Sequence, residues 1–203
     1  MGAIFRTFGF LWISFLWFAC ASDHGPAQSS SSLTSPPLPQ NWEEGYKIRL
    51  EKGDSLLADP KALLKCLPQQ LSAFNPPQTE TQSFSGQGHG FVECTQVFQM
   101  PDGHYLSIQM ADYAQDSSGF AFLYQQWQVA ATPFTLPPEH PLHFAIGWQQ
   151  RDQETGVHSL HLGLLFRFHV FLRTDLPEHE RIFSEALHAF DSKQLQALSR
   201  LYK

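Results

Sequence analysis

Charged side chains are scarce in this sequence, and it has no cluster of basic residues. Asp, Glu, Lys and Arg make up 16% of the 203 residues, and 19 acidic residues against 13 basic ones give a net charge of −6 with histidine neutral. Proteins that bind nucleic acids or anionic membrane surfaces usually concentrate basic residues on one face. The composition therefore argues against a nucleic-acid partner.

Long apolar runs are also scarce, and the one extended run lies near the N-terminus. It extends from Phe8 to Phe18 and follows a single basic residue, Arg6. A membrane-spanning helix needs about 20 apolar residues, whereas a signal peptide needs about 7–15 after a positively charged start. Residues 1–21 are therefore expected to be a signal peptide, and the remainder is expected to be exported.

Cysteine is rare too, and one of the three cysteines lies at the end of this leader. The segment LWFAC, which ends at Cys20, resembles the lipobox of bacterial lipoproteins. In that motif the cysteine is acylated and becomes the first residue, so the resemblance implies a lipid anchor to the cell envelope. Ala21 after Cys20 implies the outer membrane if the host is Gram-negative. The alternative is cleavage after Ala21, with Ala19 and Ala21 as the small-x-small site, which would give a soluble periplasmic or secreted protein.

Residues 22–41 have the composition of a flexible tether. They contain six Ser and four Pro in 20 positions and show no apolar periodicity. Such a chain cannot bury enough apolar surface to fold, and 20 flexible residues span about 25 Å. We therefore expect one folded domain, residues 42–203, held near a membrane by this tether.

The two remaining cysteines, Cys66 and Cys94, allow two interpretations. An even pair in an oxidising compartment favours a disulfide, which would stabilise the fold by about 3.5 kcal/mol in the chain-entropy model. The other interpretation is a pair of buried thiols that act as small apolar side chains. The sequence leaves both open.

The first structural signals of the domain lie in residues 46–90. Residues 46–51 (YKIRLE) alternate in polarity and predict a strand. Asp59 as N-cap and Pro60 at the first helical position predict a short helix. Residues 75–90 are rich in Pro, Thr, Ser and Gly and overlap the glycine-rich segment 85–91, and they predict a loop.

A β-hairpin is predicted next, with strands at 91–100 and 104–112 joined by Pro101-Asp102-Gly103. In the first strand, period-two alternation places four side chains on one face. These are Val92, Cys94, Gln96 and Phe98.

The second half of the domain predicts a helix, three strands and two helices. The first helix is expected to begin at a Ser117 or Ser118 cap. Strands are expected at 142–149, 157–166 and 167–173, the last two continuous or divided at Gly163. The final helices are expected to begin with Asp175 as cap and at Asp191 or Ser192. Antiparallel strands with C-terminal helices packed on them define an α+β fold.

This order of elements resembles a loose group of uncharacterised exported bacterial proteins, many of them lipoproteins. At the level of the fold it also resembles PsbP-like α/β/α sandwiches. Neither resemblance implies an activity. The residues that carry the first resemblance are Tyr105, Ile108, Asp112, Tyr113, Arg167, Phe168, Val170, Asp191 and Leu195.

Candidate chemistry centres on the ten histidines. Histidine is a frequent metal ligand, and His140 and His143 flank a short loop segment in which their rings could converge, with His89 or His104 as further ligands. His158 and His161 are three residues apart on a predicted strand, so their rings are expected on opposite faces. No metal-binding motif such as HExxH or CxxC accompanies these histidines.

Other polar residues suggest structural roles. Asp112 and Asp116 could act as a carboxylate pair, but an Asp before a helix usually forms a cap or a turn. Arg167 is expected to pair with a carboxylate such as Asp112. The sequence therefore predicts a non-catalytic protein without a cofactor, which binds an envelope protein or a small ligand. The alternative function is metal binding through His140 and His143.

Overall fold

The computed structural model describes residues 42–86, 89–130, 132–137, 139–142 and 145–199. The predictions for the leader, Cys20 and the tether, and that for His143, lie outside these residues. The described residues form five helices and seven strands, which confirms the predicted α+β class. In chain order they are α1 (Trp42–Glu51), α2 (Pro60–Cys66), β1 (Gln78–Gly86), β2 (His89–Gln99), β3 (Tyr105–Asp112), α3 (Ser117–Val129), β4 (Pro133–Phe134), β5 (Ile146–Arg151), β6 (His158–Leu164), β7 (Phe168–Thr174), α4 (His179–His188) and α5 (Ser192–Leu198).

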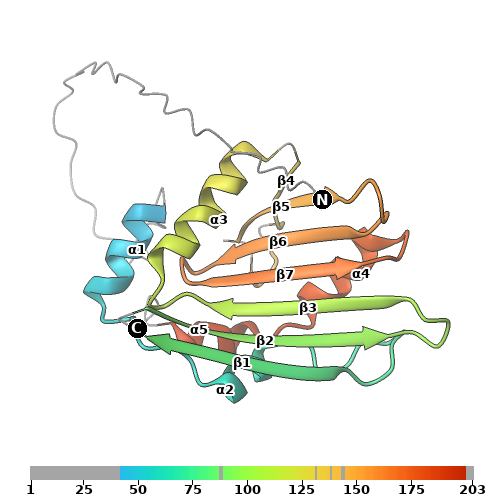
Figure 1. The fold of residues 1–203 in the computed structure, drawn as a ribbon, viewed down its shortest axis with the longest axis horizontal. Helices are drawn as coiled ribbons and strands as arrows, with labels where there is room; N and C mark the ends of the chain where they lie inside the picture. The colour runs from blue at the N-terminus through green and yellow to red at the C-terminus, as the bar shows by residue number, and fades with distance from the viewer. Residues whose placement is uncertain (1–41, 87–88, 131, 138, 143–144, 200–203) are drawn as a thin grey trace, which may run out of the picture. The chain divides into compact units, whose positions relative to one another are not determined.

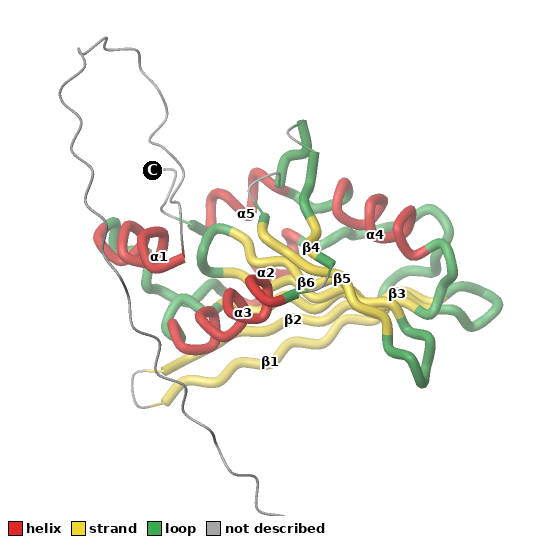
Figure 2. The backbone as a smooth tube through the Cα atoms, turned by 90° about the horizontal axis from the view of Figure 1, so that it is seen from above, coloured by secondary structure: helices red, strands yellow, loops and turns green. Residues whose placement is uncertain are grey.

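The seven strands form one sheet in the order β1-β2-β3-β7-β6-β5-β4, with every neighbouring pair antiparallel. Helices α2, α4 and α5 lie behind the sheet in Figure 1, and α3 lies in front of it. Figure 2 shows α4 and α5 on one side of the strands and α3 on the other. We call the side of α2, α4 and α5 the core face and the opposite side the front face.

The core face is built by alternation along the strands. In β3 and β7 every second residue is fully buried, and the register places Ile108 opposite Leu172 and Met110 opposite Val170. Helix α4 adds an apolar stripe that includes Phe183 and is buried against the same cluster. Burying this stripe and these strand residues away from water is the main favourable contribution to folding. None of the helices in the described part of the chain is long and apolar enough to cross a membrane.

Helix α1 occupies the segment predicted as a strand, so the prediction for residues 46–51 was wrong. As a helix, this segment buries Arg49 completely, and the Arg49 guanidinium donates to the backbone oxygens of Asp54 and Ala114. It also brings Gly45 against the ring of Phe166. A methyl group at Gly45 would lie 2.5 Å from that ring, so the close approach requires glycine. Tertiary contacts therefore outweighed the local alternation.

The predicted loop at residues 75–90 was also wrong, because most of it forms β1 and the beginning of β2. Thr79, Thr81 and Ser83 lie opposite Gln96, Cys94 and Val92 in the neighbouring strand. The side chains described in β1 are exposed, as is common in an edge strand, where polar residues replace the usual apolar signal.

The hairpin joining β2 and β3 through Pro101-Asp102-Gly103 is confirmed, and the four residues predicted to share one face of β2 are buried. The last two predicted strands, 157–166 and 167–173, are observed as β6 and β7, so they are neither continuous nor divided at Gly163. The turn between them has positive φ angles, 56° and 54°, at Leu165 and Phe166. It is closed by the N–H of Arg167, which donates to the oxygen of Leu164, and it has the two positive φ angles of a type I′ turn without glycine.

The caps of the helices follow the sequence only in part. Asp59 caps α2 and Asp191 caps α5, as predicted. Helix α3 is capped by Asp116, not by the serines that follow it. Helix α4 begins after Glu178 without a side-chain cap, because Asp175 instead accepts hydrogen bonds from Tyr105 and His104.

Candidate ligand-binding site

Arg167, in the turn before β7, is the centre of a buried ion cluster with Asp54 and Asp112. Its Nε and Nη2 donate to the two oxygens of Asp112 at 2.8 and 2.7 Å, and its Nη1 donates to Asp54. Two further bonds reach the backbone oxygens of Leu56 and Leu198. The predicted pairing of Arg167 with Asp112 is confirmed.

Every polar group of this Arg167 cluster is engaged. Arginine has five N–H donors, and all five of those in Arg167 have acceptors. Asp112 also accepts from the backbone N–H groups of Ala58 and Ala114, and Asp54 accepts from the hydroxyl of Ser199. Burial alone would lower the pKa of Arg167, but the bonds and charges of the two carboxylates outweigh it and raise the pKa.

The Arg167 cluster therefore fixes the fold and is not arranged to bind a ligand. A hollow of about 320 Å³ borders it, lined by Asp54, Leu56 and Arg167 among others. Arg167 has no donor left to offer in that hollow. Asp112 and Asp116 serve as an ion-pair partner and a helix cap, as the cap-and-turn interpretation expected.

The histidines of β6 point to opposite faces of the sheet, as their spacing predicted. His158 stacks on His179 of α4, with ring centroids 3.6 Å apart. His161 lies on the front face, stacked between Trp148 and Phe171 at 4.4 and 4.2 Å. The two rings do not share a site.

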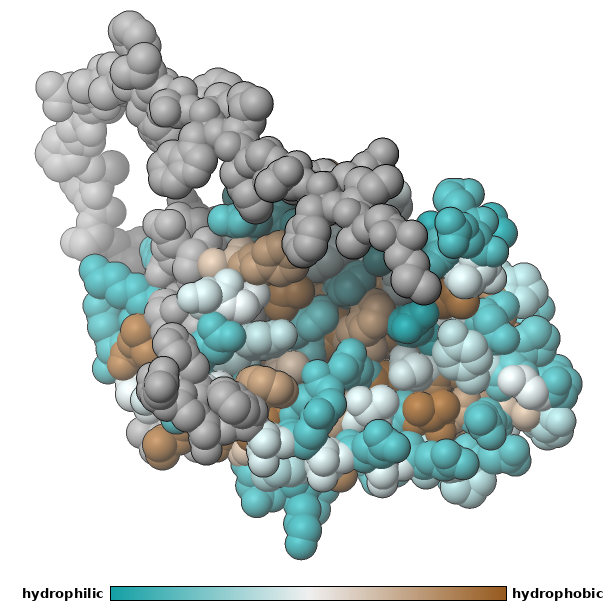
Figure 3. Space-filling view, viewed as in Figure 1, coloured by the Kyte–Doolittle hydropathy of each residue, from teal (hydrophilic) through white to brown (hydrophobic). Residues whose placement is uncertain are grey.

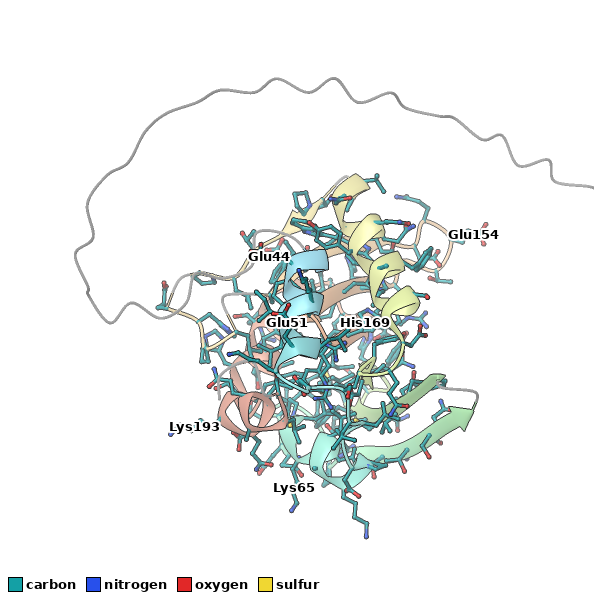
Figure 4. All side chains as sticks on the ribbon, turned by 90° about the vertical axis from the view of Figure 1, so that its left-hand side faces the viewer. Glu44, Glu51, Lys65, Glu154, His169 and Lys193 are labelled. Carbon is teal, nitrogen blue, oxygen red and sulfur yellow. The ribbon has the colours of Figure 1, made fainter. Side chains whose placement is uncertain are left out.

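A second histidine of the front face, His169, lies beside His161. The Nδ1 of His161 and the Nε2 of His169 are 3.2 Å apart, so one ring donates a hydrogen bond to the other. Burial lowers the pKa of His161 to about 4, and burial together with the charge of His161 lowers that of His169 to about 3. Both rings are therefore neutral near pH 7. In Figure 4 His169 lies among packed side chains, whereas Lys65 and Lys193 lie at the periphery.

His140 is buried, and its ring packs edge-on against that of His188 at 4.5 Å. Its Nδ1 accepts a hydrogen bond from the backbone N–H of Leu142, which places the proton of the neutral ring on Nε2. His104 bonds to Asp175 and lies far from this pair in the sequence. In the described part of the chain no three His, Cys, Asp or Glu residues group as a metal site would require. Because His143 lies outside the described residues, as does the side chain of His89, metal binding stays a prediction.

Cys66 and Cys94 are both buried and unbridged. Their thiols contact the backbone oxygens of Ala62 and Met110. Burial raises the pKa of each thiol to about 12, with a further contribution to Cys66 from Asp191 and to Cys94 from Cys66. Burial therefore disfavours the reactive thiolate form of both, and the disulfide and free-thiol alternatives stay predictions.

The front face is covered only in part, because α3 packs over β5 and β6. Figure 3 shows this face: its uncovered part is mainly hydrophilic or intermediate, with scattered apolar patches. A hollow of about 310 Å³ lies where β5 ends, β6 begins and β7 ends. We call it the sheet-end hollow. Its lining includes Gln150, Arg151, Asp152, Ser159, Phe171 and Arg173.

Arg151 and Arg173 are the two positive charges of the sheet-end hollow. Both are exposed, but Arg151 lies opposite His158 on the core-face side, whereas Arg173 lies opposite Ser159 on the front face. Backbone hydrogen bonds and, to a smaller extent, the charge of Arg173 lower the pKa of Asp152. Arg173 lies over the ring of Phe171, 5.9 Å from its centroid. Asp152 is the acidic residue in the lining, and its Oδ1 accepts from the backbone N–H groups of Glu154 and Thr155. The hollow therefore presents one guanidinium group, that of Arg173, beside an aromatic ring on the front face.

A smaller hollow of about 190 Å³ adjoins the first and shares Gln150, Arg151 and Ser159 with it. It also contains the stacked pair of His158 and His179. Burial, followed by the charges of His179 and Arg151, lowers the pKa of His158. Positive or protonatable groups are thus concentrated at this end of an acidic molecule.

Sequence reasoning did not identify the sheet-end hollow. Arg151 lies directly before the turn Asp152–Gly156 and Arg173 lies near the end of a strand, positions that suggest no chemistry by themselves. Only the antiparallel register, which sets Ser159 opposite both Gln150 and Arg173, brings these three residues together on the front face.

Comparisons with models of protein families, with curated proteins and with solved structures found no match to this chain.

Proposed function

We propose that this protein is an exported, lipid-anchored and non-catalytic binding protein, whose folded domain takes a small ligand in the sheet-end hollow. The observation that carries this proposal is the hollow itself, in which the exposed guanidinium of Arg173 lies over the ring of Phe171 beside Gln150 and Ser159. Its volume of about 310 Å³ is at the lower end of the range for small-molecule sites.

A binding role is favoured over catalysis because the buried acid, base and thiol groups already have structural partners. The oxygens of Asp54 and Asp112 accept hydrogen bonds, and His161 and His169 bond to each other. In the sheet-end hollow, backbone hydrogen bonds lower the pKa of Asp152, so this carboxylate is a weak base. A general base needs a pKa near the working pH.

Binding without catalysis is tested by screening the purified protein against single compounds, including sugars, amino acids, short peptides and phosphates. A ligand at 100 times its Kd stabilises the native state by about 2.7 kcal/mol, which raises the Tm of a domain of this size by about 5–10 °C. We expect at least one compound to do so and to be recovered chemically unchanged. A compound that is consumed, or a screen without any shift, would contradict the proposal.

The anchor is proposed from Cys20, its lipobox-like context and the Ser/Pro-rich segment that follows it. Two or three acyl chains hold a protein stably at a bilayer, whereas one does not. The test is the intact mass of the whole protein expressed in a bacterium, with Cys20→Ser as the matched variant. We expect a mature species that begins at Cys20 and carries acyl mass, which the variant lacks. A species that begins at Ser22 without lipid would instead identify a soluble exported protein.

A further inference from the structure

We infer that the outward side of helix α3 lies against the surface of the lipid bilayer in which Cys20 is anchored. Phe122 and Val129 enter the layer where the headgroups meet the acyl chains, and the helix lies parallel to the bilayer. This contact gives the folded domain a second attachment to the membrane. It rests on the lipid-anchored location proposed above and does not depend on the ligand of the sheet-end hollow.

Helix α3 packs lightly on the domain for its length. Within the described residues, none of the side chains of this 13-residue helix is buried, whereas the 10-residue α4 buries four. Phe122 and Val129 are 59% and 78% exposed. Seven residues correspond to about two helical turns, so both side chains project from the same side of α3. An apolar partner on that side would remove both from water.

The outward side of α3 carries no charge. The whole helix contains no Asp, Glu, Lys or Arg. Between its two exposed apolar side chains, the exposed residues are Gln125, Gln126 and Gln128. The solvated side of a helix usually carries charged residues, and burying these in an apolar medium is costly. Amide groups can instead keep hydrogen bonds to water and headgroups, so the composition of α3 suits the interface of a bilayer.

The chain enters the domain beside α3. Helix α1 begins at Trp42, directly after the Ser/Pro-rich segment 22–41, and it contacts α3. Figures 1 and 4 show these two helices side by side. A flexible chain of 20 residues spans only about 25 Å, so an anchor before this segment holds α1 and α3 near the bilayer. Helix α1 is not itself the contact, because its exposed residues include Glu44 and Glu51.

A neutral bilayer fits the outward side of α3 better than an anionic bilayer or a protein. The net charge of −6 opposes the approach to an anionic surface, and α3 has no basic residue to compensate. A protein partner would need a complementary surface of about 800 Å² on each side, whereas a fluid bilayer adapts to two apolar side chains on a helix. Two such side chains bind weakly alone, but the anchor raises their effective concentration at the bilayer.

The test attaches a fluorescent label to the whole mature chain and measures its quenching by the bilayer. The acylated protein is placed in phosphatidylcholine vesicles, with bimane on Gln125→Cys, on the outward side of α3. Gln194→Cys is the matched control, because Gln194 is exposed on α5, on the other side of the sheet. Brief labelling of the native protein spares Cys66 and Cys94, which are buried.

The quencher is a lipid that carries a nitroxide near the headgroup end of its acyl chain. We expect it to quench the label on Gln125→Cys at least about twofold more than that on Gln194→Cys, because an interfacial helix enters a bilayer by about 5–10 Å. High salt should not change this difference, because α3 carries no charge. Equal quenching of the two labels would overturn the inference.

The role of the apolar side chains is tested by adding Phe122→Ser to the labelled Gln125→Cys chain. This change should shift the equilibrium between contact and release by about tenfold, the effect expected when a large apolar side chain returns to water, and should lower the quenching. Leu56→Ser is the matched control, because Leu56 is 66% exposed but lies outside α3. It should leave the quenching unchanged. Equal effects of the two changes would contradict the inference.

A second tether separates this contact from the anchor. A chain that begins at Ser22 behind a histidine tag is attached to the same vesicles through a nickel-chelating lipid. If its label is quenched while the intact mass shows no acyl chain on Cys20, the contact stands and the anchor fails. If the label is quenched in neither form, the contact is wrong, and an acyl mass still establishes the anchor. Shielding of the label that appears without vesicles and grows with protein concentration would assign α3 to a second copy and also overturn the inference.

Discussion

Replacing Arg167 with methionine should remove much of the stability of the domain. Methionine fills a similar length without charge, so the change leaves Asp54 and Asp112 buried and facing each other without their shared cation. Five hydrogen bonds are lost, two of them to the backbone oxygens of Leu56 and Leu198. Breaking a buried ion pair by removing one partner costs about 3–5 kcal/mol.

That cost is a large share of the 5–15 kcal/mol by which a typical domain is stable. The assay is urea unfolding, followed by the fluorescence of the tryptophans. With a denaturant slope of about 2 kcal/mol per molar, the midpoint should fall by about 2 M. Arg181→Gln is the surface control and should lower the free energy of unfolding by less than about 1 kcal/mol, because its ion pairs are exposed.

Two further variants keep this prediction testable if Arg167→Met fails to fold. Arg167→Lys retains the charge but cannot reach both oxygens of Asp112 with a planar fork, so an intermediate loss is expected. The double variant of Arg167→Met with Asp112→Asn should cost less than the sum of the single changes, because fewer unpaired charges remain buried. A loss below about 1 kcal/mol in Arg167→Met, or strict additivity in the double variant, would refute the reasoning.

Two other predictions concern buried titratable groups. The pKa values of His161 and His169, about 4 and about 3, lie below the ordinary value of 6.5. At pH values between the folded and the ordinary pKa, the unfolded chain therefore binds more protons than the folded one. The free energy of unfolding should therefore fall as the pH drops below 6.5, by up to about 1.4 kcal/mol per pH unit for each histidine. A variant with glutamine at both positions should lose this slope between pH 6.5 and 5. A flat profile for the unmodified protein would contradict the prediction. Burial raises the pKa of Cys66 and Cys94 to about 12. Both should therefore react with iodoacetamide at pH 8 at least about 1,000-fold more slowly in the reduced native protein than in urea. Rapid labelling of the native protein would show that they are not buried. The intact mass of the exported protein decides between bridge and thiols, because a disulfide lowers it by about 2 Da.

Local sequence signals were sufficient wherever one residue type has a single strong preference. The hairpin at Pro101-Asp102-Gly103 and the caps Asp59 and Asp191 were predicted for this reason. The buried side of β2 also followed from its sequence, because alternation with period two has only one consistent arrangement on a sheet. The opposite orientations of His158 and His161 follow from the same rule.

The signals failed where neighbours in space decided the structure. Strand β1 is polar because it lies at an edge, and its pairing with β2 is what makes it a strand. Helix α1 alternates like a strand, yet the contacts of Arg49 and Gly45 hold it as a helix. The turn at Leu165 and Phe166 contains no glycine, so its positive φ angles could not be read from composition.

By itself the sequence determined an α+β class, an acidic chain with a leader-like start, and the partnership of Arg167 with Asp112. Each of these depends on composition, on local periodicity or on the rule that a buried charge needs a partner. The tertiary structure alone decided which strands are neighbours, and therefore which distant residues meet. It added Asp54 to the Arg167 cluster across 113 positions of chain, stacked His158 on a helix, and placed Arg173 beside Ser159 and Gln150. Side chains brought together by strand register leave no mark in the local sequence, because register depends on the whole sheet.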